Sequence, residues 1–126
     1  MPTEASAQST RATSRSKPPL RKRSLLTQEQ GLDLAALFKV LANDTRLRLL
    51  HALVREEELC VGDLADALEM RPQAVSNQLQ RLTDRGIVGA RRNGTNIFYR
   101  IVDPCVPTLL DQGLCLSEDA KGRSQK

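Results

Sequence analysis

Three cysteines have the most distinctive chemistry in this chain. They are Cys60, Cys105 and Cys115, and the chain of 126 residues has one histidine, His51. An odd number of cysteines argues against a framework of disulfides. Thiolates are instead the ligands that soft ions prefer, so the cysteines predict a site for Hg(II), As(III), Cd(II), Pb(II) or Cu(I). Cys60 and Cys115, each taken alone, are also compatible with a packing residue, whereas Cys105 is the hardest of the three to explain in this way.

A polar segment at residues 72–84 offers a second kind of chemistry. Its apolar side chains, Val75, Leu79 and Leu82, recur at helical spacing and would hold one face against a core. The opposite face carries amide, hydroxyl and guanidinium groups, at Gln73, Ser76, Asn77, Gln80 and Arg81. Asn and Gln pair with adenine, and Arg pairs with guanine, in the major groove of DNA. The segment therefore predicts a helix that reads DNA bases.

The net charge of +4 is concentrated in two segments of the chain. Residues 1–25 carry six Lys or Arg and one Glu, and residues 71–100 carry six Arg and one Asp. Such local excesses of positive charge favour a polyanionic partner. In the second segment we expect Arg91 and Arg92 to contact DNA phosphates or to reach the minor groove.

The elements that must position these residues follow from apolar spacing and from residues that begin or end helices. Helices are expected from Thr27, from Asn43 or Asp44, across residues 61–68, from Pro72 to about residue 85, and from about Asp103 onward. Between the last two helices, Asn93-Gly94 separates two extended runs and predicts a hairpin with a type I′ turn at this pair. The low aromatic content of 2% fits a mainly helical core.

These elements predict one small domain. We expect residues 1–24 to be a disordered basic tail, residues 25–116 to fold, and residues 117–126 to be a disordered C-terminal tail. Two short helices followed by a basic hairpin predict a mainly α fold with a β-hairpin wing, a winged helix-turn-helix bound to double-stranded DNA. Because no apolar run approaches the roughly 18 residues that span a membrane, and no apolar signal segment is seen, we expect a cytoplasmic protein without a membrane partner.

Four segments resemble the ArsR/SmtB family of transcriptional repressors. They are residues 37–50, similar to its second helix, 58–65, similar to the start of its helix-turn-helix, 74–82, similar to its recognition helix, and 86–99, similar to its wing. The resemblance implies a homodimer formed through the first and last helices, which represses genes by binding a palindromic operator. It also implies that an effector, usually a metal ion, releases the DNA.

The chain departs from both main metal sites of that family. Cys60 matches the thiolate site at the third helix, but Gly62 replaces its second cysteine. In the zinc site of the last helix Asp103 matches, whereas Cys105 and Leu116 stand where the family has histidines. A zinc site is therefore poorly supported. The three cysteines favour a soft ion instead, with Hg(II) or As(III) first and Cd(II) or Pb(II) as further candidates.

The spacing of Cys105 and Cys115 limits how they can share an ion. On one continuous helix they are about 15 Å apart along the axis and about 80° apart around it. Two arrangements therefore stay open. Either Gly113 breaks the helix and folds Cys115 back, or Cys105 faces Cys115 of the partner subunit in an antiparallel pair of helices. Three thiolates in one site would further require Cys60 to lie beside the start of the last helix.

Other functions were weighed against a metal-responsive repressor. In the same fold, two cysteines close together in the dimer could instead form a disulfide or persulfide bridge and act as a thiol switch. A constitutive DNA binder would respond to neither metals nor oxidants. An enzyme is not supported, because the sequence lacks a nucleophile–histidine constellation, a phosphate-binding loop and a catalytic carboxylate pair. We expect His51 to have a structural role.

Overall fold

The computed structural model describes residues 17–124, and the chain divides into two compact units between Asn43 and Asp44. Most of the expected basic tail and residues 125–126 lie outside the described residues. Among the described residues, no helix is both long enough and apolar enough to cross a membrane.

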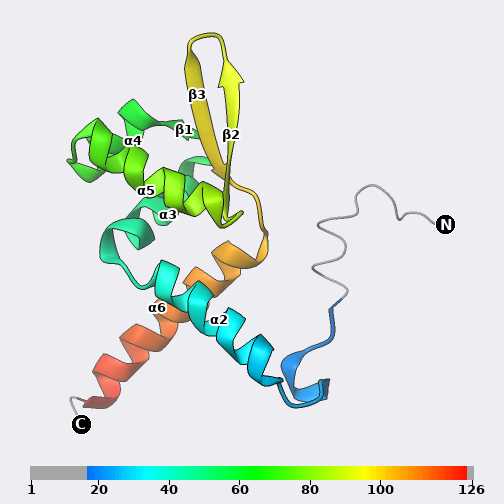
Figure 1. Ribbon diagram of the computed structural model, residues 1–126. Helices are drawn as coiled ribbons and strands as arrows, with labels where there is room; N and C mark the ends of the chain where they lie inside the picture. The colour runs from blue at the N-terminus through cyan, green and yellow to red at the C-terminus, as the bar shows by residue number, and fades with distance from the viewer. Residues whose placement is uncertain (1–16, 125–126) are drawn as a thin grey trace, which may run out of the picture. The chain divides into compact units, whose positions relative to one another are not determined.

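The N-terminal unit consists of a short 3-10 helix, η1 (Leu20–Lys22), and helix α2 (Gln28–Leu41) (Figure 1). Thr27 caps α2 as expected. Its hydroxyl accepts a hydrogen bond from the Gln30 backbone, and the Gln30 side chain accepts one from the Thr27 backbone. Three large apolar side chains of α2 are exposed, at Leu32, Leu34 and Phe38.

The second unit holds the predicted helix-turn-helix and wing. Its elements in chain order are α3 (Asp44–Glu56), β1 (Leu59–Cys60), α4 (Val61–Leu68), α5 (Pro72–Asp84), β2 (Val88–Asn93), β3 (Asn96–Ile101) and α6 (Cys105–Ser124). The strands form an antiparallel sheet in the order β1-β3-β2, and the β2–β3 hairpin extends beyond the helices (Figure 1). The winged helix-turn-helix prediction is therefore confirmed, with β1 as an additional third strand.

Leucine side chains from the helices form the core of this unit. Leu49 and Leu50 of α3, Leu64 of α4 and Leu82 of α5 are at most 1% exposed. Burial of each such side chain contributes about 1.5–3 kcal/mol to folding. This shared core fixes which face of α5 points away from the protein.

Local backbone signals set the ends of α4 and α5. Glu69 has a φ of 56° and ends α4 in the left-handed conformation, and the Met70 N–H donates to the Ala65 carbonyl. Pro72 occupies the first turn of α5, where its missing N–H leaves no bond unmade. Gly86, with a φ of 75°, follows the end of α5 and directs the chain into the hairpin.

The hairpin turn lies one residue later than predicted. The strand register pairs Asn93 with Asn96, so the two turn residues are Gly94 and Thr95 rather than Asn93 and Gly94. Gly94 has a φ of 68°, whereas Thr95 is not among the residues with positive φ. This is the pattern of a type II′ turn. The physical reason is that a β-branched residue tolerates positive φ poorly, while glycine adopts it freely.

Helix α6 is longer than predicted and is unbroken at Gly113 (Figure 1). One glycine costs a helix only about 1 kcal/mol, which neighbouring turns can offset. Lys121 and Arg123 lie in the last turn, where positive charge favours the carboxyl end of a helix. Residues 117–124 are therefore helical where the sequence predicted a disordered tail, and residues 117–123 are exposed.

Candidate nucleic-acid interface and metal centre

The exposed face of α5 carries the residues predicted to read DNA. Val75, Leu79 and Leu82 are at most 1% exposed and hold the other face of the helix in the core. The predicted reading set is exposed except for Ser76, which is half-buried: Gln73, Ser76, Asn77, Gln80 and Arg81. The helix therefore presents amide, hydroxyl and guanidinium groups together on one outward surface.

Side-chain hydrogen bonds give three of these groups a defined orientation. Gln73 Nε2 donates to Asn77 Oδ1 at 3.2 Å, and Gln80 Nε2 donates to Asp84 Oδ1 at 2.9 Å. Both bonds join residues four apart, which are neighbours on a helix surface. Amides that are already oriented lose less entropy when they bind a base.

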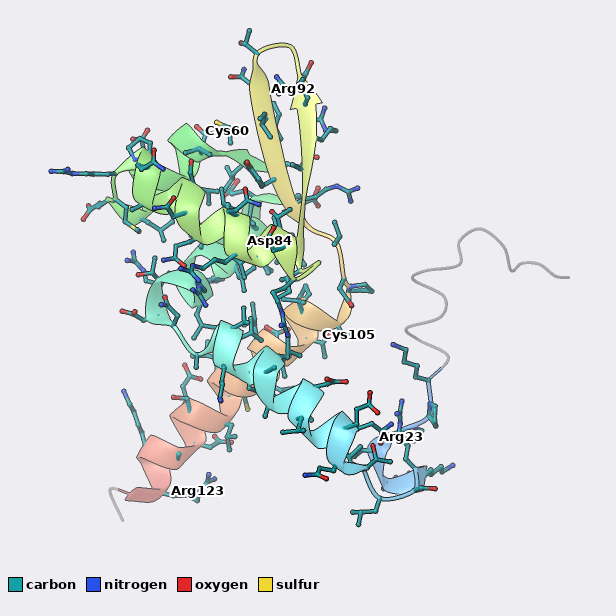
Figure 2. The ribbon with its side chains drawn as sticks, in the orientation of Figure 1. Arg23, Cys60, Asp84, Arg92, Cys105 and Arg123 are labelled. Atoms are coloured by element: carbon teal, nitrogen blue, oxygen red, sulfur yellow. The ribbon has the colours of Figure 1, made fainter. Side chains whose placement is uncertain are left out.

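The two neighbouring arginines of the wing have different surroundings. Arg91 makes a two-point ion pair with Glu58, with Nη2–Oε1 at 2.7 Å and Nε–Oε2 at 3.1 Å. Its guanidinium also lies over the Phe98 ring, 5.2 Å from the centroid. Arg92 follows on the opposite face of β2, exposed on the outer part of the hairpin (Figure 2).

The ion pair shifts the pKa values of both partners. The hydrogen bond and charge of Arg91 lower the pKa of Glu58, and Arg100 adds a smaller effect in the same direction. The hydrogen bond and charge of Glu58 raise the pKa of Arg91. Both shifts favour the charged forms, so the pair stays ionised at neutral pH.

An open hollow of about 520 Å³ lies beside this ion pair. Its walls come from α3, the link before β1, the hairpin and the start of α6. Glu58 and Arg91 line it, as does Asp103. Asp103 Oδ1 accepts a hydrogen bond from the backbone N–H of Cys105 at 2.8 Å. The hollow therefore extends from the base of the wing to the residues that begin α6.

The three cysteines lie in separate places of one chain. Cys60 is half-buried in β1, and its thiol donates to Asp63 Oδ2 at 3.3 Å. Cys105 is the exposed first residue of α6 (Figure 2), and Cys115 is exposed on the same helix, with its thiol 3.8 Å from Asp119 Oδ2. None of the three cysteines forms a disulfide within residues 17–124.

Within residues 17–124 of one chain, no three His, Cys, Asp or Glu side chains are grouped so that they could hold a metal ion. Because α6 continues through Gly113, Cys105 and Cys115 stay about 15 Å apart along its axis. The fold-back arrangement is therefore wrong. The arrangement between two subunits stays a prediction. His51 is exposed on α3, and its structural role also stays a prediction.

Sequence reasoning missed Glu58 and the contact between α3 and α5. Glu58 belongs to an acidic run that looks like a simple link, and its partner Arg91 is 33 residues away. Arg46 Nε donates to Gln78 Oε1 at 2.6 Å across a similar separation. No spacing pattern reveals such pairs, because they depend on how the elements pack. The sequence shows only that Glu58 and Arg91 have opposite charges and that Arg46 and Gln78 have complementary polar groups.

Comparison with known proteins identifies the family. The AntR antimony-specific transcriptional repressor has a crystal structure that is 62% identical in sequence, and the match covers 85% of this chain and 96% of that one with a TM-score of 0.73. Residues 43–89 match the family described as bacterial regulatory protein, arsR family. The chain belongs to the ArsR family. Regulators of this family control transcription, so the ArsR-family chain is a DNA-binding regulator and not an enzyme.

Two further relatives bear on the assembly and the effector. A homodimeric winged helix-turn-helix DNA-binding domain from Mycobacterium bovis, a possible ArsR-family regulator, is 32% identical, with 77% of this chain and 92% of that chain covered and a TM-score of 0.65. The arsenic resistance transcriptional regulator of Pseudomonas putida is 43% identical over 75 residues. That match spans 60% of this chain but only 58% of the relative's length.

Proposed function

We propose that this ArsR-family chain is a homodimeric repressor that leaves its operator when a trivalent metalloid binds cysteine thiolates. The observation that carries the proposal is the presence of two exposed thiols, Cys105 and Cys115, on one unbroken helix. Relatives named for antimony and for arsenic support As(III) or Sb(III) as the effector, ahead of Hg(II), Cd(II) and Pb(II).

The DNA side of the proposal rests on α5 and the wing. The outward groups of α5 would enter the major groove, where amides and guanidinium groups read base edges. Arg92 would contact the phosphate backbone beside them. A homodimer would place two such helices about one turn of DNA apart, so we expect a palindromic operator.

The proposed metal site lies between two subunits. In an antiparallel pair of α6 helices, Cys105 would face Cys115 of the partner subunit, which gives two equivalent sites in each dimer. Pyramidal As(III) and Sb(III) take three thiolates, and Cys60 is the remaining cysteine that could supply the third. The exposed apolar side chains Leu114 and Leu116 support helix pairing in this region, because they gain burial only against a partner.

Release of DNA follows from linkage between the two sites. A metalloid can weaken DNA binding only if it binds more tightly to a dimer conformation that has lower affinity for DNA. Ligands contributed by both subunits fix the relative orientation of those subunits. The orientation sets the spacing of the two α5 helices, so the site is well placed to select such a conformation.

The deciding experiment is an ultraviolet titration of the reduced dimer with As(III), Sb(III), Hg(II), Cd(II), Pb(II) and Zn(II). Free thiols are counted at each endpoint, and operator binding is followed by fluorescence anisotropy. We expect As(III) and Sb(III) to give a saturating thiolate absorption band, to protect thiols and to release DNA. If all thiols stay reactive with every ion, the metal proposal is wrong.

The same titration separates the metal proposal from a thiol switch. The exposure of both Cys105 and Cys115 also favours oxidation, because accessible thiols react most readily. A bound ion is removed by a chelator that contains no thiol and cannot reduce a disulfide. A disulfide needs a reductant, and DNA release that appears only after oxidation would favour the switch.

A further inference from the structure

We propose that Glu58 is a positioning residue for the wing, and that it holds Arg91 away from DNA so that Arg92 makes the wing's phosphate contact. The proposal rests on the DNA binding proposed above. It reassigns Arg91, which the sequence predicted as a DNA ligand, and it gives a role to the acidic link before β1.

The Arg91 guanidinium is held by two partners at once. Two of its nitrogens donate to the two carboxylate oxygens of Glu58, and its plane lies over the Phe98 ring. A guanidinium that donates two hydrogen bonds to one carboxylate is oriented much better than a guanidinium with a single surface contact. To reach a phosphate, Arg91 would have to give up both the carboxylate and the ring.

Phe98 and Arg91 are aligned across the sheet with Cys60, two residues after Glu58. Cys60 pairs with Phe98, and Phe98 pairs with Arg91, so the three residues form one cross-strand row. Residues directly opposite in a sheet point to the same face, and so do residues two apart in one extended strand. Glu58 and Arg91 therefore meet on the face occupied by the Phe98 ring.

The pairing that joins β1 to the hairpin is short. The short strand β1 joins β3 through only two pairs, Leu59 with Tyr99 and Cys60 with Phe98. The ion pair adds a connection that crosses β3 and reaches the outer strand β2. Glu58 thereby fixes the direction of β2, and with it the position of Arg92 on the opposite face of that strand.

The salt dependence of DNA binding tests this assignment. A residue that neutralises a phosphate adds about 0.9 to the slope of log affinity against log salt. The probes are a duplex selected by the wild-type protein from random-sequence DNA and an unselected duplex of the same length. We expect R92A to lower the slope by about one on both duplexes. On the unselected duplex, where a phosphate contact needs no fixed orientation of the wing, we expect R91A to leave the slope unchanged.

We expect substitutions of Glu58 to change the salt slope in the opposite direction to R92A. In E58Q the carboxylate charge is lost and Arg91 is released, so we expect a steeper slope on the unselected duplex. Affinity for the selected duplex falls by about tenfold, because the wing is no longer oriented. The double variant E58R/R91E restores the ion pair in reverse, and we expect it to recover most of the affinity lost in E58R and in R91E.

A second measurement keeps failure of this proposal separate from failure of the proposed function. Amide hydrogen exchange of β2 is measured without DNA, and we expect E58Q and R91A to accelerate it while R92A does not. The assignment of Glu58 is wrong if R91A lowers the salt slope on the unselected duplex as much as R92A does. It is also wrong if the amide exchange of β2 is unchanged in E58Q. If the wild-type protein selects no DNA, the proposed function is wrong.

Discussion

Arg46 Nε donates a hydrogen bond to Gln78 Oε1 at 2.6 Å, and this contact joins the start of α3 to the middle of α5. Gln78 is half-buried, and it lies between the exposed Asn77 and the buried Leu79 in the sequence of α5. The contact therefore holds α5 against α3. We expect a residue in this position to affect how α5 is presented to DNA and to leave unchanged which bases α5 would read.

We predict that Gln78→Ala lowers operator affinity about tenfold without altering base preference. The reason is that α5 loses one of the contacts that fix its direction, while its reading groups stay in place. Gln80→Ala is the matched comparison, because Gln80 lies on the outward face and its loss should change preference. Selection of operators from random DNA with each variant measures both effects, and an altered consensus for Gln78→Ala would contradict the prediction.

Thr83→Val should raise the free energy of unfolding by about 1 kcal/mol. The Thr83 hydroxyl is buried and has no hydrogen-bond partner among the residues that the structure describes. An unsatisfied buried polar group costs about 1–3 kcal/mol, and valine has the same shape without that group. Urea denaturation at one fixed protein concentration measures the change. Thr83→Ser, which keeps the hydroxyl, should not be stabilised.

Gly89→Ala should destabilise the base of the wing by about 1–3 kcal/mol. A Cβ atom at Gly89 would lie 2.7 Å from Val102 Cγ1, which is closer than carbon atoms approach without strain. Val102→Ala removes that methyl group, so the double variant Gly89→Ala/Val102→Ala should recover most of the loss. Denaturation of the two single variants and the double variant checks this, and equal loss in the double variant would rule out the steric cause.

The ion pair should make part of the stability depend on pH in the acid range. The pKa of Glu58 is lowered below 4.5 in the folded chain, mainly by its hydrogen bond to Arg91. A lowered carboxyl pKa contributes stability above the unfolded value, and that contribution is lost as the pH falls through the folded value. The difference between the wild-type protein and E58Q should therefore be constant from neutral pH to about 5 and shrink below about 4.5. Urea midpoints across this range measure it.

A mixed dimer tests whether the metalloid site is shared between subunits. In homodimers of Cys105→Ser or Cys115→Ser, every proposed pair lacks one thiolate, so we expect no thiolate absorption band with As(III). A dimer with one subunit of each variant keeps one complete pair and should bind about half the wild-type amount. Affinity tags of two kinds purify this mixed dimer. If the purified mixed dimer gives no thiolate absorption band with As(III), the shared site is excluded.

The elements that carry strong local signals were predictable from the sequence. The limits of α4 and α5 follow from leucine spacing, from proline at the start of α5 and from Gly86 after its end. Each of these signals acts within a few residues. The outward reading face of α5 was predictable for the same reason, since burial of Leu79 and its neighbours leaves one face outside.

Features that depend on packing were not predictable in this way. Arg91 and Arg92 are the same residue type in adjacent positions, and only the sheet register shows which of them lies on the face of Phe98 and which lies on the opposite face. The turn lies one residue later than the Asn-Gly pair predicts, because the observed turn needs positive φ only at Gly94, whereas the predicted type I′ turn would need it at Asn93 as well. Whether Cys105 and Cys115 bind the same ion depends on how two subunits pair, and the sequence of one chain does not describe that pairing.

The unbroken length of α6 gives the molecule a rigid arm. From Val106, which is buried, to Arg123 the helix rises about 26 Å, and its last turns are exposed on all sides. A rotation of about 10° at the buried end therefore displaces the far end by about 4.5 Å. Spin labels at the tips of two such arms would convert a small change in subunit orientation into a distance that electron resonance can read.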